Sequence, residues 1–203
     1  MKALFERLIE ANERRYKQAE NPLKSHGPDH HIRVWHYAQG LADRLKVQFD
    51  DEILAGACLL HDLAAYYPEK SGENYHDFDH VLAAEVLEEI GFPENKHVRV
   101  LDSIKNHGSD PNYKREGEPI ETVLLRDADK MDVFGPVGVA RVVMVRTLKG
   151  DTLEQIVDDF LTQGHLQRKF DSITTREARG LVEADFRYSL DFFKRLKEGL
   201  KHE

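Results

Sequence analysis

A histidine and an aspartate, His61 and Asp62, end a segment that is otherwise almost wholly apolar after Glu52. Imidazole and carboxylate groups are costly to bury in such a setting unless something compensates them. Consecutive helical side chains diverge by about 100°, yet both of these side chains can still reach one ion lying beside the helix. The pair by itself is also explained by a structural role, in which neighbouring groups satisfy it or it caps a helix. A metal site would need partners from other helices.

Side chains of the required types occur elsewhere in the chain. His30 opens an earlier predicted helix, and Asp129 lies in the segment Leu124–Asp132, where several acids stand beside an apolar stretch. The chain has 11 histidines, and nine of them fall between His26 and His107, a clustering that composition alone does not explain. Three predicted helices therefore offer a His, a His-Asp pair and an Asp that could converge.

The elements that must position these side chains are helices. Apolar residues recur at helical spacing nearly everywhere, and no segment shows a convincing alternating strand pattern. Asp29 is the predicted N-cap of the second helix, and Thr174 with Glu177 forms a predicted capping box for the last. Loops are predicted at 66–77 and 108–119. After a first apolar stripe at Leu4–Ile9, the predicted helices are 29–46, 50–64, 78–90, 94–106, 120–132, 136–149, 152–163 and one beginning at Thr174.

Length and composition favour one soluble helical domain. The 203 residues suit a single domain spanning 1–203, which we expect to be an all-α helical bundle. A formal net charge of −8 argues against nucleic acid or an anionic membrane as a partner, since both need a basic surface. The single cysteine, Cys58, cannot form an intramolecular disulfide, and charged residues interrupt the N-terminal segment where a signal peptide would be apolar. A cytoplasmic location is the simplest expectation.

The order His, His-Asp, Asp of these candidates resembles the H…HD…D signature of the HD-domain metal-dependent phosphohydrolase superfamily. The segment SHGPDHHIRVWHYA at 25–38 looks like the first helix of that superfamily, in which the ligand His lies three residues before an Arg, and this selects His30. The segment RDADKMDVFGPVGVAR at 126–141 is similar to the DADxLDxxG segment of the small stand-alone HD hydrolases, where the ligand is the second Asp, here Asp129. The resemblance spans about residues 25–141.

The resemblance implies a helical bundle that holds a divalent metal ion. The implied ligands are His30, His61, Asp62 and Asp129, with Asp62 also assigned as catalytic. A mixed nitrogen and oxygen set suits Mn, Fe, Co, Ni or Zn better than Ca. Such an ion would polarise a phosphoryl oxygen and lower the pKa of a bound water. We therefore expect hydrolysis of a phosphoester or phosphoanhydride bond, with a phosphorylated small molecule, a nucleotide, as substrate.

Two further histidines decide whether one ion or two would bind. His80 begins a predicted helix and His107 ends another. In the superfamily, histidines at such places complete a second metal site or contact the substrate phosphate. With two ions, Asp62 would be the bridging ligand. Both histidines are also explained as helix caps or surface groups.

Three basic residues are candidates to neutralise phosphate charge, because ionised donors make the stronger hydrogen bonds. They are Lys130, which we also assign as catalytic, Arg33 and Arg141. Arg33 is equally explained as a structural ion-pair partner of a nearby acid.

A general base is not visible beside the His-Asp pair. Several nucleotide-cleaving members of the superfamily carry an acid three positions after the HD aspartate, where this chain has Ala65. Glu69, Lys70 and Glu73 in the following predicted loop are candidates to replace it.

Other functions stay open at this point. Six candidate ligands in chain order also resemble those of the di-iron oxygenases of the same superfamily: His30, His61, Asp62, His80, His107 and Asp129. An oxygen-dependent reaction and about two irons per chain would favour that function. A non-catalytic ligand-binding HD module would be expected to lack one of the four primary ligands, and none is missing. The long C-terminal helix leaves room for a homodimer contact.

Overall fold

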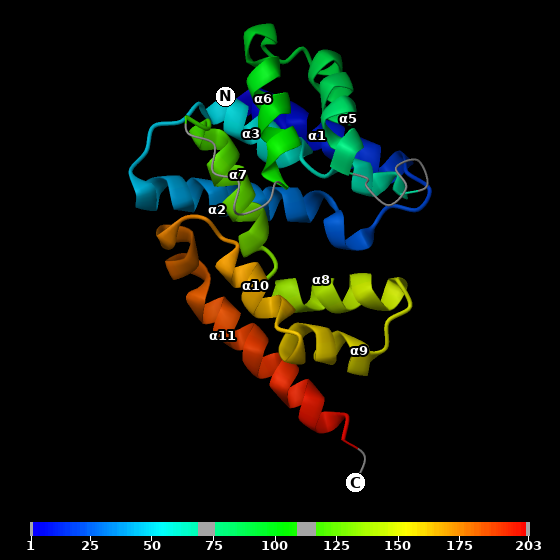
Figure 1. The fold of residues 1–203 in the computed structure, drawn as a ribbon. Coiled ribbons are helices and arrows are strands. Elements are labelled where there is room, and N and C mark those ends of the chain that lie inside the picture. Colours follow the sequence, from blue (N-terminus) through cyan, green and yellow to red (C-terminus); the bar gives the residue numbers. More distant parts are fainter. Residues whose placement is uncertain (1, 69–75, 109–116, 202–203) are drawn as a thin grey trace. The chain divides into compact units, whose positions relative to one another are not determined.

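The computed structural model describes residues 2–68, 76–108 and 117–201. These residues form helices joined by turns and none of them lies in a strand, which confirms the predicted all-α fold. The chain separates into two compact units, Met1–Ala128 and Asp129–Glu203, and each is described by itself (Figure 1). The single domain expected over the whole chain stays a prediction.

Helix α3 is the centre of the first unit. The helices of this unit are α1 (Lys2–Gln18), α2 (Pro28–Leu45), α3 (Asp51–Leu60), α5 (His76–Glu89), α6 (Glu94–His107) and α7 (Ile120–Met131), the last of which continues past Ala128. Every residue from Ile53 to Leu60 is buried, because α1, α2 and α6 all pack against α3. Gly56 permits the close approach of α6, since a Cβ there would lie 3.2 Å from the side chain of Val100.

The second unit is built around a long final helix. Its helices are α8 (Gly135–Leu148), α9 (Leu153–Val157), the π-helical turn η4 (Asp158–Thr162), α10 (His165–Asp171) and α11 (Arg176–Gly199). Helix α11 packs against α8 and α9 (Figure 1). Stacked rings form part of its core, with the ring centroids of Phe160 and Phe193 5.0 Å apart and those of Phe170 and Phe186 4.3 Å apart. The stability of this unit therefore depends on aromatic packing.

Several predicted boundaries were wrong. The second helix begins with Pro28 after Gly27 as its N-cap, so Asp29 lies in the first turn instead. The last helix begins at Arg176, because the hydroxyl of Thr175, rather than that of its neighbour Thr174, accepts the backbone hydrogen bond of Ala178. Two consecutive threonines make the capping pattern ambiguous by one residue.

The region between the last two predicted helices also differs. The helix predicted over 152–163 is α9 followed by the π-helical turn η4, and α10 follows where the sequence predicted no helix. Helix α5 begins at His76, two residues before the predicted start. Most of the loops predicted at 66–77 and 108–119 lie outside the described residues. Within the described ranges, none of the helices combines the length and apolar character that a bilayer-spanning segment needs.

Candidate metal centre

The His-Asp pair lies at a break in the helix rather than inside it. Helix α3 ends at Leu60, where the sequence predicted one helix over 50–64. His61 keeps helical backbone angles, but Asp62 (φ −119°, ψ 31°) leaves the helix and a short 3-10 turn, η2 (Leu63–Tyr66), follows. The carboxylate of Asp79 on α5 holds this turn by accepting a 2.8 Å hydrogen bond from the backbone N–H of Ala64. The prediction was wrong because that contact is long-range.

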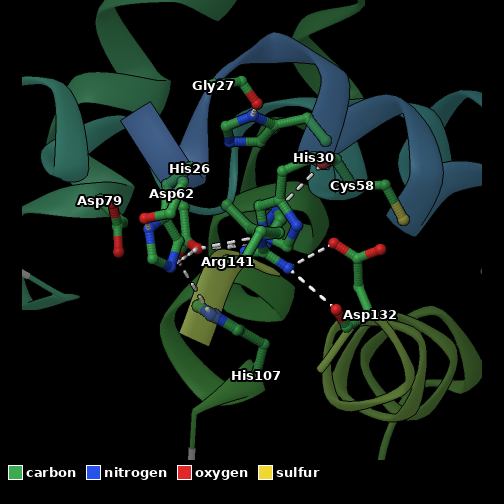
Figure 2. Close-up of polar contacts among 12 residues, drawn as sticks. His26, Gly27, His30, Cys58, Asp62, Asp79, His107, Asp132 and Arg141 are labelled. Carbon is green, nitrogen blue, oxygen red and sulfur yellow. Dashed lines mark hydrogen bonds and ion pairs between the residues drawn. The ribbon is translucent and has the colours of Figure 1, made fainter. Parts of the chain in front are cut away.

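Asp62 is surrounded by imidazole rings. Its side chain is only 4% exposed. The distances from its carboxylate oxygens to histidine Nε2 atoms are 3.4 Å for His30, 3.5 Å for His61, 3.7 Å for His107 and 3.9 Å for His26 (Figure 2). Burial alone would raise the pKa of the Asp62 carboxyl, but the imidazoles, that of His61 first, hold this pKa well below its usual range. The group is therefore a buried carboxylate anion.

Backbone carbonyls fix the tautomers of two of these histidines. The Nδ1 atom of His61 lies 2.9 Å from the carbonyl oxygen of Cys58, and Nδ1 of His107 bonds the carbonyl oxygen of Ile104. A carbonyl oxygen can only accept, so each Nδ1 carries a proton and Nε2 is the nitrogen left to face Asp62 or to bind a metal ion. Histidines that bind metals are held in this way by an acceptor on the other ring nitrogen.

Four residues bring metal-ligating atoms together. His30, His61 and Asp62 are buried and Asp129 is half-buried, and one ligand atom from each lies within 4.8 Å of the others. Asp129 is on α7, one residue beyond Ala128 on the same continuous helix. Bonds of about 2.0–2.2 Å place two ligands of one ion up to about 4.4 Å apart, so the group needs only a small contraction to hold a divalent ion. The donor set therefore fits a transition-metal ion.

The two further histidines, His107 and His80, lie in different surroundings. His107 faces Asp62, as described above. His80 lies in the second turn of α5, half-buried, and its Nδ1 is buried with no hydrogen-bond partner among the described residues. Ala65 is fully buried in η2, and the loop residues 69–73 that could replace a general base lie outside the described part of the chain.

The three predicted phosphate-binding residues each have a partner in the structure. Arg33 Nη1 donates a 2.6 Å hydrogen bond to Asp29 one turn earlier, which matches the structural alternative for this residue. In the second unit, Lys130 Nζ donates to the carbonyl oxygen of Ser172 at 2.7 Å. Arg141 donates to both the carboxylate and the carbonyl oxygen of Asp132 (Figure 2).

The sequence interpretation missed two histidines of this cluster, His26, whose Nε2 lies 3.9 Å from Asp62, and His31. His31 is fully buried, and its ring centroid lies 4.9 Å from that of His61 and 5.5 Å from that of His30. Burial, followed by repulsion from His61 and His30, lowers the pKa of His31 well below its usual value, so its ring is neutral. The only signal in the sequence was its position directly after His30, which does not distinguish a buried neighbour from an exposed one.

Comparison with known proteins places this arrangement in a family. The family model of the HD domain matches residues 29–133, just over half of the chain. The chain belongs to the HD-domain family. The matched range contains His30, His61, Asp62 and Asp129, so the metal-ligating group lies within the HD domain.

Relatives of this HD-domain protein cover most of its length. It is 27% identical over 180 residues to the uncharacterized protein YpgQ of Bacillus subtilis, covering 82% of this chain and 83% of YpgQ. The structure of YpgQ in complex with ADP matches with a TM-score of 0.67 and 23% identity, over 93% of this chain and 97% of YpgQ. An HD-superfamily hydrolase from Bacillus thuringiensis matches with a TM-score of 0.70 and 22% identity, over 98% and 97% of the two chains. These likenesses establish the fold.

Proposed function

We propose that this HD-domain protein is a metal-dependent phosphohydrolase that cleaves a phosphoester or phosphoanhydride bond of a nucleotide. The observation that carries the proposal is the convergence of the buried His30, His61 and Asp62 with the half-buried Asp129. Two comparisons support it: structural neighbours are described as HD-superfamily hydrolases, and YpgQ was solved in complex with ADP.

The residues of the centre have separate tasks in this function. Nε2 lone pairs of His30 and His61 and carboxylate oxygens of Asp62 and Asp129 would hold a divalent ion such as Mn²⁺. When bound, the ion would polarise a phosphoryl oxygen and acidify a water molecule. The surrounding imidazoles hold the pKa of Asp62 well below its usual range, so this ligand is anionic.

The remaining predicted residues act on the substrate or on a second ion. We assign phosphate binding to Arg33, Lys130 and Arg141, whose guanidinium and ammonium groups carry several donors each. His107, whose Nε2 lies 3.7 Å from Asp62, together with His80 would take a second ion or contact the phosphate. With two ions, Asp62 would be a ligand of both.

The deciding experiment compares Asp62→Ala with the wild type on a panel of nucleoside mono-, di- and triphosphates in the presence of Mn²⁺. We expect the wild type to release phosphate or pyrophosphate from at least one nucleotide and Asp62→Ala to lose this activity by more than about 100-fold. Asp191→Ala, an exposed carboxylate paired with Arg195, is the control and should keep full activity. Unchanged turnover in Asp62→Ala would contradict the metal assignment.

Metal analysis and oxygen dependence separate this proposal from the alternatives. Phosphate release that proceeds without oxygen excludes the di-iron oxygenase. About two irons per chain with oxygen consumption on a small polar molecule would instead establish it. Nucleotide binding without turnover in the metal-loaded protein would identify a non-catalytic binding module.

A further inference from the structure

A chain of buried hydrogen bonds connects α1 to the histidine cluster. The side-chain amide of Asn12 donates to the carbonyl oxygen of Leu59, at the end of α3. Its carbonyl Oδ1 accepts a 2.7 Å hydrogen bond from the hydroxyl of Tyr66, and this hydroxyl lies 3.2 Å from Nδ1 of His31. Asn12, Tyr66 and His31 are each no more than 1% exposed. Bulk solvent therefore does not reach these groups, and neighbouring protein groups set their orientations.

The direction of each hydrogen bond follows from the chemistry of the groups. Because the carbonyl of Leu59 can only accept, it orients the amide of Asn12 so that Oδ1 faces Tyr66. The hydroxyl of Tyr66 must then donate to Asn12, which leaves only its oxygen lone pairs for His31. Nδ1 of His31 also faces the carbonyl oxygen of Gly27 at 3.3 Å, a second acceptor. His31 is therefore held with its proton on Nδ1 and a bare lone pair on Nε2.

No donor among the described residues meets that lone pair. Nε2 of His31 is buried and has no hydrogen-bond partner among the described residues. Its ring contacts those of His30 and His61, two of the four metal-ligating residues, yet His31 is not among the residues whose ligand atoms converge. Buried polar atoms of this kind in native proteins call for an explanation, which is commonly a ligand or an ordered water. The position of Nε2 of His31 therefore indicates a hydrogen-bond acceptor beside the metal centre rather than a fifth metal ligand.

We propose that Asn12, Tyr66 and His31 form a positioning chain that presents Nε2 of His31 as the acceptor of a hydrogen bond from a water molecule at the occupied metal centre. The proposal rests on the metal centre of the proposed function, but not on the reaction. Asn12 and Tyr66 act only through His31: they hold its ring in place and keep the proton on the nitrogen that points away from the water.

Two matched pairs of variants test the chain by Mn²⁺ titration calorimetry. In His31→Gln the side-chain amide can place an acceptor near the position of Nε2, whereas His31→Asn reaches only the position of Nδ1. We expect His31→Asn to weaken Mn²⁺ binding about 10-fold and His31→Gln to recover most of that loss. Tyr66→Phe should also weaken binding about 10-fold. Tyr16→Phe removes a hydroxyl from a ring 5.1 Å from that of Tyr66 and should bind Mn²⁺ like the wild type.

Unfolding temperatures measured with a chelator separate positioning from simple destabilisation. A purely structural role lowers the unfolding temperature of the metal-free variants and leaves the Mn²⁺ affinity of the folded protein unchanged, and that result overturns the proposal. Equal losses in His31→Gln and His31→Asn overturn it as well. If His31→Asn does not fold, the two tyrosine variants decide alone.

The two proposals fail in different ways. Wild-type protein that binds Mn²⁺, shows these variant effects and hydrolyses no nucleotide contradicts only the proposed function. Wild-type protein that binds Mn²⁺ and hydrolyses nucleotides, with unchanged affinity in Tyr66→Phe and His31→Asn, contradicts only the positioning chain.

Discussion

Each unit of the molecule contains an aspartate in contact with histidine, and the two aspartates have different surroundings. In the first unit, Asp62 is 4% exposed and lies between the Nε2 atoms of several histidines, two of which backbone carbonyls hold with the proton on Nδ1. In the second unit, Asp159 is 17% exposed, and it pairs with the guanidinium of Arg146 and lies 3.5 Å from Nδ1 of His165.

The two aspartates differ in the source of the positive charge that balances each carboxylate. Arg146 carries a permanent positive charge and also pairs with Asp151, so the second cluster has its cation built into the chain. Around Asp62, the Nε2 atoms of several imidazoles face the carboxylate, and each of these nitrogens can give up its proton and bind an ion. An aspartate among imidazole Nε2 atoms is arranged to bind a cation, whereas an aspartate beside an arginine is arranged to stabilise the fold.

Replacing Asp62 by Asn should have the largest effect. The change keeps the size of the side chain and removes its charge, so we expect Mn²⁺ affinity to fall by more than about 100-fold, since loss of even an indirect partner of a ligand costs 10–100-fold. Titration calorimetry checks this. A Mn²⁺ affinity within tenfold of the wild type would show that the carboxylate of Asp62 is not a metal ligand.

Phe193→Ala tests the core of the second unit. The side chain is fully buried and stacks on Phe160. We expect the free energy of unfolding to fall by about 3–5 kcal/mol, through lost burial and the cavity left behind. Urea denaturation measures the loss. A loss below about 1 kcal/mol would show that the stacked rings contribute little.

Acidification should act on the first unit through its ligands. A histidine must be unprotonated to bind a metal, and the free imidazole pKa is about 6.5. Protons therefore compete with the ion, and Mn²⁺ affinity should fall by about 10-fold or more between pH 7.5 and pH 5.5. Calorimetry at several pH values tests this, and a flat profile would contradict histidine ligation.

Asp159→Asn is the counterpart of Asp62→Asn and should have a small effect. Partly exposed ion pairs contribute about 1 kcal/mol or less, so the free energy of unfolding should change by no more than that. Mn²⁺ affinity should match the wild type. A loss of metal binding in this variant would remove the distinction between the two aspartates.

The smallest expected effect concerns His165. Partial burial lowers the pKa of His165, and the nearby Asp159 opposes this only in part. Because the folded-state pKa lies below the unfolded value, the unfolded protein binds the proton first as the pH falls below about 6.5, and acid destabilises the fold. Metal-free His165→Gln should therefore lose slightly less stability than the wild type between pH 7 and pH 5, as measured by thermal unfolding. An equal loss in both proteins would show that His165 does not contribute.

A helix defined by local interactions agrees with its prediction, and a helix end set by a long-range contact does not. Helix α6 was predicted as 94–106 and lies at Glu94–His107, because apolar spacing and a start after Pro93 are local properties. The helix predicted over 50–64 stops at Leu60, where a carboxylate from α5 bonds the turn. The π-helical turn at Asp158–Thr162 is likewise not encoded in a pattern of period 3.6.

Residue type and order along the chain are enough to predict the helical class and the candidate ligands His30, His61, Asp62 and Asp129. The protonation of Nδ1 in His61 and His107 depends on folding, since the acceptors are particular carbonyl oxygens that the packed helices bring into place. Packing also buries His31 and leaves Arg33 near the surface, although the two residues lie on the same turn of α2. Burial and hydrogen-bond direction are properties of the packed molecule, and they give these histidines their chemistry.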